Sequence, residues 1–119
     1  MPRQLSRRFA TKQYHLVATA LTETAVDPYA ADLAHDRIAL LIGNEHAGLS
    51  ATLLDAADTV ACIPMRGFIQ SFNASVTAAL MLAEITRQRR TSGQVFYLDN
   101  ASAHALASRW LGREDSATE

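Results

Sequence analysis

The chain has 119 residues, a formal net charge of −1 at pH 7, 49% hydrophobic residues and 19% charged residues. This composition predicts one folded domain and excludes a disordered chain, because it supplies enough apolar side chains for a core. The single cysteine, Cys62, excludes a disulfide framework and a cysteine-based zinc site, and the four histidines show no metal-ligand spacing. No apolar run approaches the roughly 20 residues that span a membrane, and no apolar stretch follows the cationic start as in a secretory signal. We therefore expect a cytoplasmic domain with no membrane contact and no metal.

Apolar runs alternate with stretches of helical spacing along the chain. In its first half the sequence predicts a strand at 14–20, helical turns at 29–34, a strand at 37–42, a helix capped by Ser50 and a strand at 59–63. In its second half it predicts a helix at 71–90, an extended piece at 95–98, a weaker helix at 101–111 and a frayed tail from Gly112. The run at 37–42 is nearly continuously apolar, which is typical of a strand buried on both faces of a parallel sheet. This order predicts the fold class α/β, a parallel sheet with flanking helices that binds ligands where its strands end.

The long helix predicted at 71–90 carries many apolar side chains. Those that recur at helical spacing are Val76, Ala79, Leu80 and Ala83, and those that widen this surface are Met81, Leu82 and Ile85. Such a surface is expected to face the core. Gly93 is a plausible residue to end the helix.

The loop at 43–48 follows a predicted buried strand. Gly43 lacks a Cβ, so the backbone there can turn sharply and approach a ligand, and Gly48 gives a second permissive point. The glycine-rich fingerprints of dinucleotide and phosphate-binding loops are absent. Glu45 is the charged residue of this loop; it either accepts hydrogen bonds from loop amides or a substrate, or it is an exposed surface charge.

The loop at 64–73 leads into the long helix. Ser71 at the predicted helix start and Asn73 in its first turn could hold a phosphate or carboxylate, because a helix N-terminus attracts anions. The alternative for Ser71 is a simple N-cap. Met65 and Phe72 suit the wall of a pocket for a flat ring, or alternatively ordinary core packing.

Two basic clusters stand out in this near-neutral chain. The first comprises Arg3, Arg7, Arg8 and Lys12, and the second comprises Arg87, Arg89 and Arg90. They either contact phosphates or have bland roles, as a solvated terminus and as cations that complement a helix dipole.

Taken together, the two loops resemble a known family. Residues 42–49 resemble the second motif of the SpoU (TrmH-like) branch of the SPOUT RNA methyltransferases, and residues 63–76 resemble the third. Pieces around 18–19, 24–27 and 87–89 are similar to the tRNA guanosine-2′-O-methyltransferases of that branch. The resemblance covers most of residues 14–93.

The resemblance implies a SPOUT-type α/β knot, with a trefoil knot at the C-terminal half, that binds S-adenosyl-L-methionine and works as a homodimer. It implies transfer of the cofactor's methyl group to a ribose 2′-hydroxyl of an RNA, with tRNA favoured and rRNA as the other class. Matching motif positions assign cofactor binding to Gly43, Ile63, Met65 and Phe72, and active-site roles to Glu45, Ser71 and Asn73. The corresponding division is a basic segment at 1–13, the cofactor-binding half of the catalytic domain at 14–93, and a C-terminal helix and tail at 94–119.

The family's first motif, which supplies an Arg that assists deprotonation of the hydroxyl, has no match here. We therefore expect the N-terminal half of the usual domain to be missing, and neither Arg7 nor Arg8 is assigned as this Arg. Phe72 replaces the usual Leu and Ala74 the usual Val. Three hypotheses remain: a methyltransferase lacking upstream residues, a non-catalytic cofactor- or RNA-binding remnant, and a small interaction domain with chance similarity.

Overall fold

The computed structural model describes residues 2–44, 46–68, 72–94 and 97–114. Its elements are α1 (Pro2–Thr11), β1 (His15–Thr19), β2 (Ile38–Ile42), α2 (Ala51–Ala56), β3 (Thr59–Ala61), α3 (Ala74–Thr91) and α4 (Asn100–Glu114). Within these ranges, no helix is long and apolar enough to cross a membrane.

The three strands form one parallel sheet in the order β2-β1-β3. The central strand β1 places Val17 opposite Leu40 on one side and opposite Thr59 on the other. Leu16, Val17 and Ala18 are buried because both edges and both faces of β1 are covered. The predicted α/β class, a parallel sheet with flanking helices, is confirmed.

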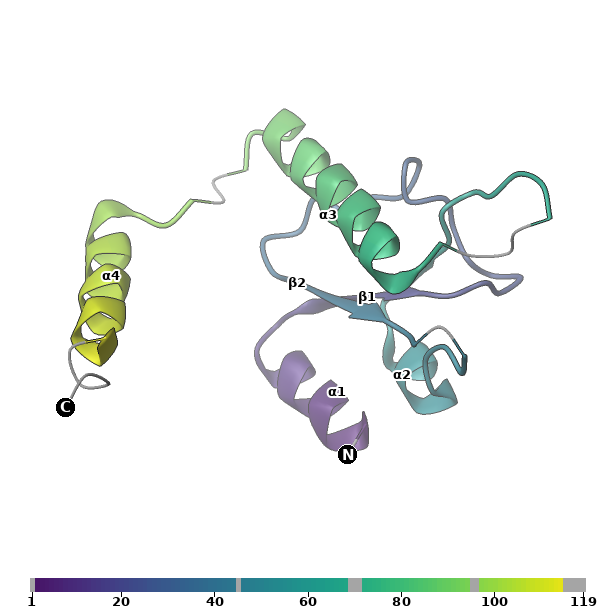
Figure 1. Cartoon of the computed structure of the whole chain (residues 1–119), viewed down its shortest axis with the longest axis horizontal. Helices are drawn as coiled ribbons and strands as arrows, with labels where there is room; N and C mark the ends of the chain where they lie inside the picture. Colours follow the sequence, from purple (N-terminus) through teal and green to yellow (C-terminus); the bar gives the residue numbers. More distant parts are fainter. Residues whose placement is uncertain (1, 45, 69–71, 95–96, 115–119) are drawn as a thin grey trace.

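Helices cover both faces of the sheet (Figure 1): α3 lies on one face, and α1 and α2 lie on the other. The core lies under α3, where Met81 and Ile85 meet Val17, Leu33 and Ala61. Four of these five side chains are completely buried, and Ile85 is 5% exposed. Near the C-terminal end of α1, the ring of Phe9 packs edge-on against the ring of Tyr14.

The face of α3 that packs on the sheet differs from the predicted one. Met81, Glu84 and Ile85 are buried, whereas Val76, Ala79 and Ala83 are exposed, as is Leu82. The prediction that Val76, Ala79 and Ala83 face the core is therefore wrong. The helix carries apolar residues on two sides, and the periodicity alone could not decide which side meets the sheet. An apolar surface on α3 consequently faces solvent in this chain.

Several predicted boundaries are also corrected. Residues 2–11 form helix α1, which was not predicted, and β3 ends at Ala61. Residues 28–30 form a turn rather than a helix, and α4 continues through Gly112 instead of fraying there. The piece predicted at 95–98 lies partly outside the described residues, and the part that is described is not a strand.

A buried polar cluster explains why residues 29–34 do not form a helix. The Gln88 side chain of α3 donates to the Pro28 carbonyl at 3.1 Å and accepts from the Leu33 N–H at 2.8 Å. It also donates to Glu84 Oε1 at 2.8 Å. Gln88 thus holds the segment 28–33 against α3 through two backbone groups that a local helix would have used itself.

Glu84 is 5% exposed and carries the charge of this cluster. Arg87 donates to its two oxygens at 2.9 and 2.7 Å. These hydrogen bonds, together with the one from Gln88, hold the pKa of Glu84 at about 2, below its ordinary value of 4.5. A carboxyl group whose pKa is lowered by folding stabilises the fold above its unfolded pKa, and that contribution disappears as the pH falls toward the folded pKa.

We therefore expect Glu84→Gln to lower the free energy of unfolding by about 1–2 kcal/mol at pH 6.5, the range for a hydrogen bond to a charged group. The difference between the wild-type chain and the variant should shrink as the pH falls from about 4.5 toward 2, where the wild-type carboxyl also loses its charge. Urea denaturation at pH 6.5 and at pH 3 measures this. If the free energies of unfolding of the two proteins differ as much at pH 3 as at pH 6.5, the lowered pKa assigned to Glu84 is contradicted.

Helix α4 lies apart from the sheet (Figure 1). The radius of gyration is 17.1 Å, against about 13.5 Å for a compact domain of this length. Trp110 and Leu111 of α4 are 61% and 62% exposed. Asp99 caps this helix by accepting from the Ser102 N–H at 2.8 Å, and its pKa is lowered by that bond and by the one from the Ser102 hydroxyl.

Candidate functional site

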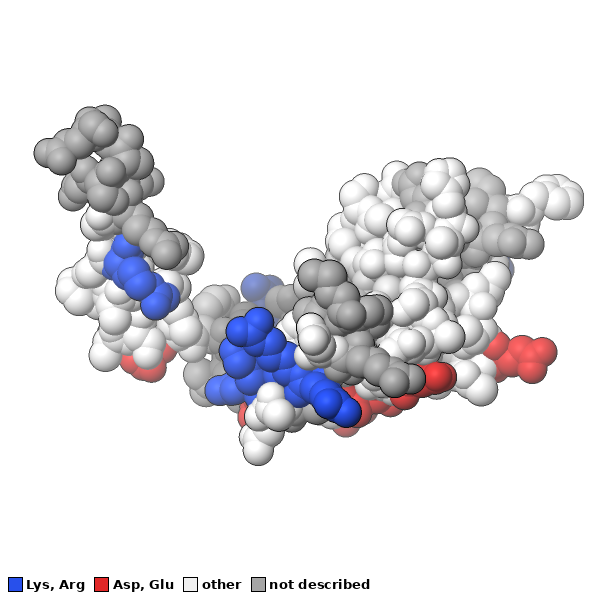
Figure 2. All heavy atoms as spheres, turned by 90° about the horizontal axis from the view of Figure 1, so that it is seen from below, with Lys and Arg blue, Asp and Glu red and all other residues white. Residues whose placement is uncertain are grey.

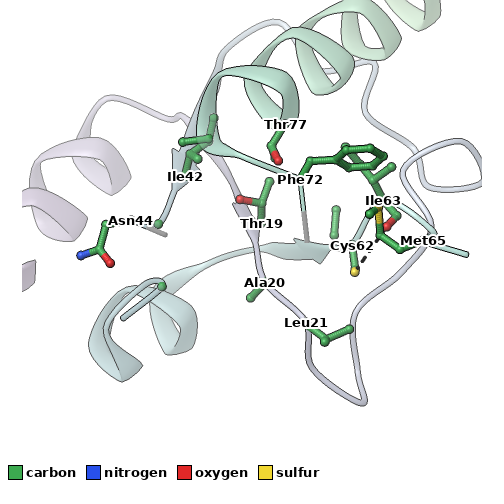
Figure 3. A pocket seen from close by; sticks show the side chains of 14 residues that line it. Thr19, Ala20, Leu21, Ile42, Asn44, Cys62, Ile63, Met65, Phe72 and Thr77 are labelled. Atoms are coloured by element: carbon green, nitrogen blue, oxygen red, sulfur yellow. Dashed lines mark hydrogen bonds between the residues drawn. The ribbon is translucent and has the colours of Figure 1, made fainter. Parts of the chain in front are cut away.

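A pocket of about 210 Å³ lies where the three parallel strands end. Figure 3 shows its walls, which come from the ends of β1, β2 and β3 and from the start of α3. The described residues that line it are Thr19, Ala20, Leu21, Ile42, Gly43, Asn44, Gly48, Ala61, Cys62, Ile63, Met65, Phe72, Ala74 and Thr77. The carboxyl edge of a parallel sheet is the expected position for a ligand, and the structure places the pocket there.

The loop after β2 turns back on itself at one end of the pocket. Asn44 Oδ1 accepts from the N–H groups of His46 at 3.0 Å and Ala47 at 2.6 Å, and the Gly48 N–H donates to the Asn44 carbonyl at 3.1 Å. The side chain of Asn44 therefore holds its own loop, and in Figure 3 its amide points away from the other labelled side chains.

Gly43 is required by this turn. A Cβ at residue 43 would lie 2.4 Å from the Gly48 carbonyl carbon and 2.6 Å from its Cα, both backbone atoms that cannot rotate away. Gly48 itself has a φ of +64°, a conformation that glycine adopts without strain. The loop presents backbone rather than side chains to the pocket beside Ile42.

The opposite wall is apolar. Ile63, Met65 and Phe72 lie close together there (Figure 3), and Phe72 is 37% exposed at the pocket's edge. Cys62, predicted to be a buried strand residue, instead follows the end of β3, is half-buried and lines the pocket. A flat ring would contact apolar side chains on this side and backbone on the other.

The start of α3 borders the pocket through Ala74 and Thr77. Its N-cap is Asn73, whose Oδ1 accepts from the Val76 N–H and from the Ser75 hydroxyl, each at 2.9 Å. The predicted helix start at Ser71 is therefore wrong, because the helix begins at Ala74. The positive end of the α3 dipole favours a negatively charged group of a ligand here.

The structure brings all four residues predicted to bind a cofactor, Gly43, Ile63, Met65 and Phe72, into the wall of one pocket. Asn73 does not line the pocket but caps the helix that does. Glu45 and Ser71 lie outside the described residues.

Sequence reasoning missed the contributions of Thr19 and Thr77. The position of Thr19 at the end of a predicted strand was a usable signal, and its hydroxyl donates to the Leu41 carbonyl at 3.2 Å. No local pattern marked Thr77. None of the described lining residues carries a formal charge, so their contribution is shape, apolar contact and backbone groups.

These features define an α/β protein with a ligand pocket at the carboxyl edge of a parallel sheet. The model of the SpoU rRNA Methylase family matches residues 3–83. The chain belongs to this family.

Individual relatives support this assignment. A tRNA (guanosine(18)-2′-O)-methyltransferase of Escherichia coli (strain K12) is 40% identical over 96 residues, which are 81% of this chain and 42% of the relative. The crystal structure of the A. aeolicus TrmH/SpoU tRNA modifying enzyme superposes with a TM-score of 0.83 at 29% identity, covering 96% of this chain and 58% of that one. The crystal structure of an AdoMet-bound rRNA methyltransferase from Sinorhizobium meliloti superposes with a TM-score of 0.61 at 34% identity, covering 68% of this chain and 32% of that one. The chain spans less than half the length of the curated relatives it matches.

Proposed function

We propose that this chain provides the cofactor-binding part of an S-adenosyl-L-methionine-dependent RNA 2′-O-ribose methyltransferase, with tRNA as the substrate class. The observation that carries the proposal is the single pocket that joins both motif loops at the carboxyl edge of the sheet. The E. coli relative named for this reaction and the AdoMet-bound S. meliloti structure support it.

The pocket suits S-adenosyl-L-methionine. The missing Cβ of Gly43 lets the Gly48 backbone close the turn on one side of the pocket, and Ile63, Met65 and Phe72 offer an apolar wall for an adenine ring on the other. The N-terminus of α3, at Ala74, is placed to favour the cofactor's carboxylate or an RNA phosphate.

When bound, the cofactor would supply a methyl group on a positively charged sulfur; the C–S bond would break as the ribose 2′-oxygen bonds to the methyl carbon, leaving a neutral thioether, and the hydroxyl proton would pass to a base or to water. The chain's task is positioning, since such an attack requires the reacting atoms about 3–3.5 Å apart. Asn44 and Asn73 fix the two loops by bonding their backbones. We assign the placement of the ribose and phosphate to Glu45, Ser71 and Asn73, on the basis of the motif resemblance.

We also propose that the chain works as a homodimer, that the pocket loops form the family's trefoil knot, and that the protein acts in the cytoplasm on tRNA. The exposed apolar side chains Val76 and Leu82 on α3, and Trp110 and Leu111 on α4, support a homodimer. Exposed apolar side chains of this size are removed from water when two copies associate, which favours association. The same proposal divides the chain into a basic segment at 1–13, the cofactor-binding half of the catalytic domain at 14–93, and a C-terminal helix and tail at 94–119.

Titration calorimetry of the full chain with S-adenosyl-L-methionine tests the proposal, and Asn73→Ala sharpens it. Loss of an N-cap costs about 0.5–2 kcal/mol, and here it also frees the start of the helix that lines the pocket. We expect cofactor affinity to fall about tenfold, which corresponds to 1.4 kcal/mol.

Asn73→Ser, which retains a capping oxygen, should recover most of the affinity, and Arg109→Ala in α4 should leave it unchanged. A folded wild-type chain that does not bind the cofactor would contradict the proposal and favour a non-catalytic remnant. Equal affinities for Asn73→Ala and Arg109→Ala would contradict the role given to Asn73.

A further inference from the structure

Helix α1 and the residues beside it display a group of positive charges. Arg7 and Arg8 are exposed on α1, and Lys12 is exposed just after its end. Arg37 joins them from the segment before β2, because its Nη1 donates to the Lys12 carbonyl at 3.2 Å. These four residues are called the α1 basic face. Figure 2, which views the molecule from the side of α1, shows Lys and Arg side chains gathered in one patch with acidic side chains along its border.

Contacts within the fold account for only part of these charges, namely Arg8 and Arg37. Arg7, Arg8 and Lys12 form no ion pair with any residue that the structure describes. The first turn of α1 contains no acidic residue, and Arg8 is the described cation of its last turn that complements the helix dipole. Neighbouring like charges repel weakly. The arrangement is therefore slightly unfavourable in the free chain and would be relieved by a bound polyanion.

The α1 basic face lies at the amino edge of the sheet, opposite to the pocket. The last residue of α1, Thr11, leads through a short turn into β1, so the helix runs back along the sheet. Lys12 and Arg37 therefore stand near the starts of β1 and β2. Ten helical residues extend about 15 Å, enough for several cations to meet successive phosphates of one strand.

The chemistry of the cations favours phosphates over carboxylates of a protein partner. Three of the four residues are arginines, whose planar guanidinium groups bind phosphate oxygens through two parallel hydrogen bonds. The whole chain has a net charge of −1, so any attraction for RNA must come from a local patch rather than from overall charge.

We propose that the α1 basic face contacts the phosphate backbone of the RNA substrate, at a distance from the nucleotide that enters the pocket. This inference rests on the proposed function. It assigns to Arg7, Arg8, Lys12 and Arg37 the binding of RNA without sequence preference, whereas the pocket selects the reacting ribose.

The test measures binding of the full chain to an unmodified tRNA transcript by fluorescence anisotropy between 50 and 200 mM KCl. The triple variant Arg7→Gln, Arg8→Gln and Lys12→Gln keeps the helix propensity of α1. We expect its affinity at 100 mM KCl to fall about 10- to 100-fold, and the slope of log affinity against log salt to fall by about 2–3. Arg109→Gln on α4, an exposed cation away from this face, is the control and should change neither quantity.

Cofactor binding by the triple variant separates this inference from the proposed function. We expect S-adenosyl-L-methionine affinity equal to that of the wild-type chain. If the variant and wild type bind the transcript with the same slope, the α1 basic face is not the RNA contact, although the proposed function survives. If the wild-type chain binds phosphatidylserine vesicles but no transcript, the face belongs to a membrane contact and the inference is overturned. If the wild-type chain itself does not bind S-adenosyl-L-methionine, that result contradicts the proposed function and not this inference alone.

Discussion

Gly43→Ala is expected to abolish measurable binding of S-adenosyl-L-methionine and to lower the free energy of unfolding by about 2–3 kcal/mol, the upper range for overpacking. The added methyl group would lie 2.4 Å from the Gly48 carbonyl carbon. Backbone cannot yield as a flexible side chain does, so the turn between residues 43 and 48 has to open. The apolar wall formed by Ile63, Met65 and Phe72 would then lose the backbone surface that faces it across the pocket.

Gly112→Ala is the matched control for this substitution. Residue 112 lies within α4, and a Cβ there meets nothing within 4 Å. Alanine is favoured over glycine in a helix by about 0.5–1 kcal/mol, so this variant should be slightly more stable and should bind the cofactor normally. Calorimetry and urea denaturation of both variants give the comparison. Normal cofactor binding by Gly43→Ala would show that the turn is not part of the cofactor site.

The second large effect is expected from Met81→Ala. Met81 is completely buried between α3 and the sheet, against Val17 and Leu33. Truncating a buried side chain of this size costs about 2–5 kcal/mol, because the cavity left behind is only partly filled. For a domain of this length, such a loss lowers Tm by roughly 10 °C or more.

Leu82→Ala removes a similar apolar volume from the next residue of the same helix, but Leu82 is 54% exposed. In the isolated chain it should change the free energy of unfolding by less than about 1 kcal/mol. Thermal unfolding followed by circular dichroism at low protein concentration separates the two. If Leu82→Ala proves the more damaging variant, the orientation of α3 described above is wrong. If its effect grows with protein concentration, Leu82 lies in the homodimer interface.

The sequence predicts what is local. The strand at 37–42, the cap at Ser50 and the role of Gly93 just after α3 each depend on a few adjacent residues, and the structure confirms all three. The expected burial of that strand on both faces is wrong, because β2 is a half-buried edge strand. The pocket was also predictable in outline, because it requires only that two loops follow parallel strands.

What the sequence does not predict is which distant groups meet. Gln88 reaches the backbone of Pro28 and Leu33 across the fold, and this contact favours a turn at residues 28–30 over a helix at 29–34. Glu84 lies on the buried side of α3, where Arg87 and Gln88 of the same helix donate hydrogen bonds to it, so this side contains a charge and did not look like a core face. Thr77 borders the pocket because α3 begins at Ala74.

The central place of β1 determines when this site can exist during synthesis. Among the three described strands β1 leaves the ribosome first, and both of its partners come later: β2 pairs with it from Ile38 and β3 from Thr59. Each pocket loop follows one of those later strands, and the last wall is Thr77 of α3. Parallel partners separated by intervening chain pair slowly because each closure orders a long segment. A nascent chain therefore carries β1 with at least one open edge until Ala61 has emerged, and it gains the complete pocket only after Thr77 has followed.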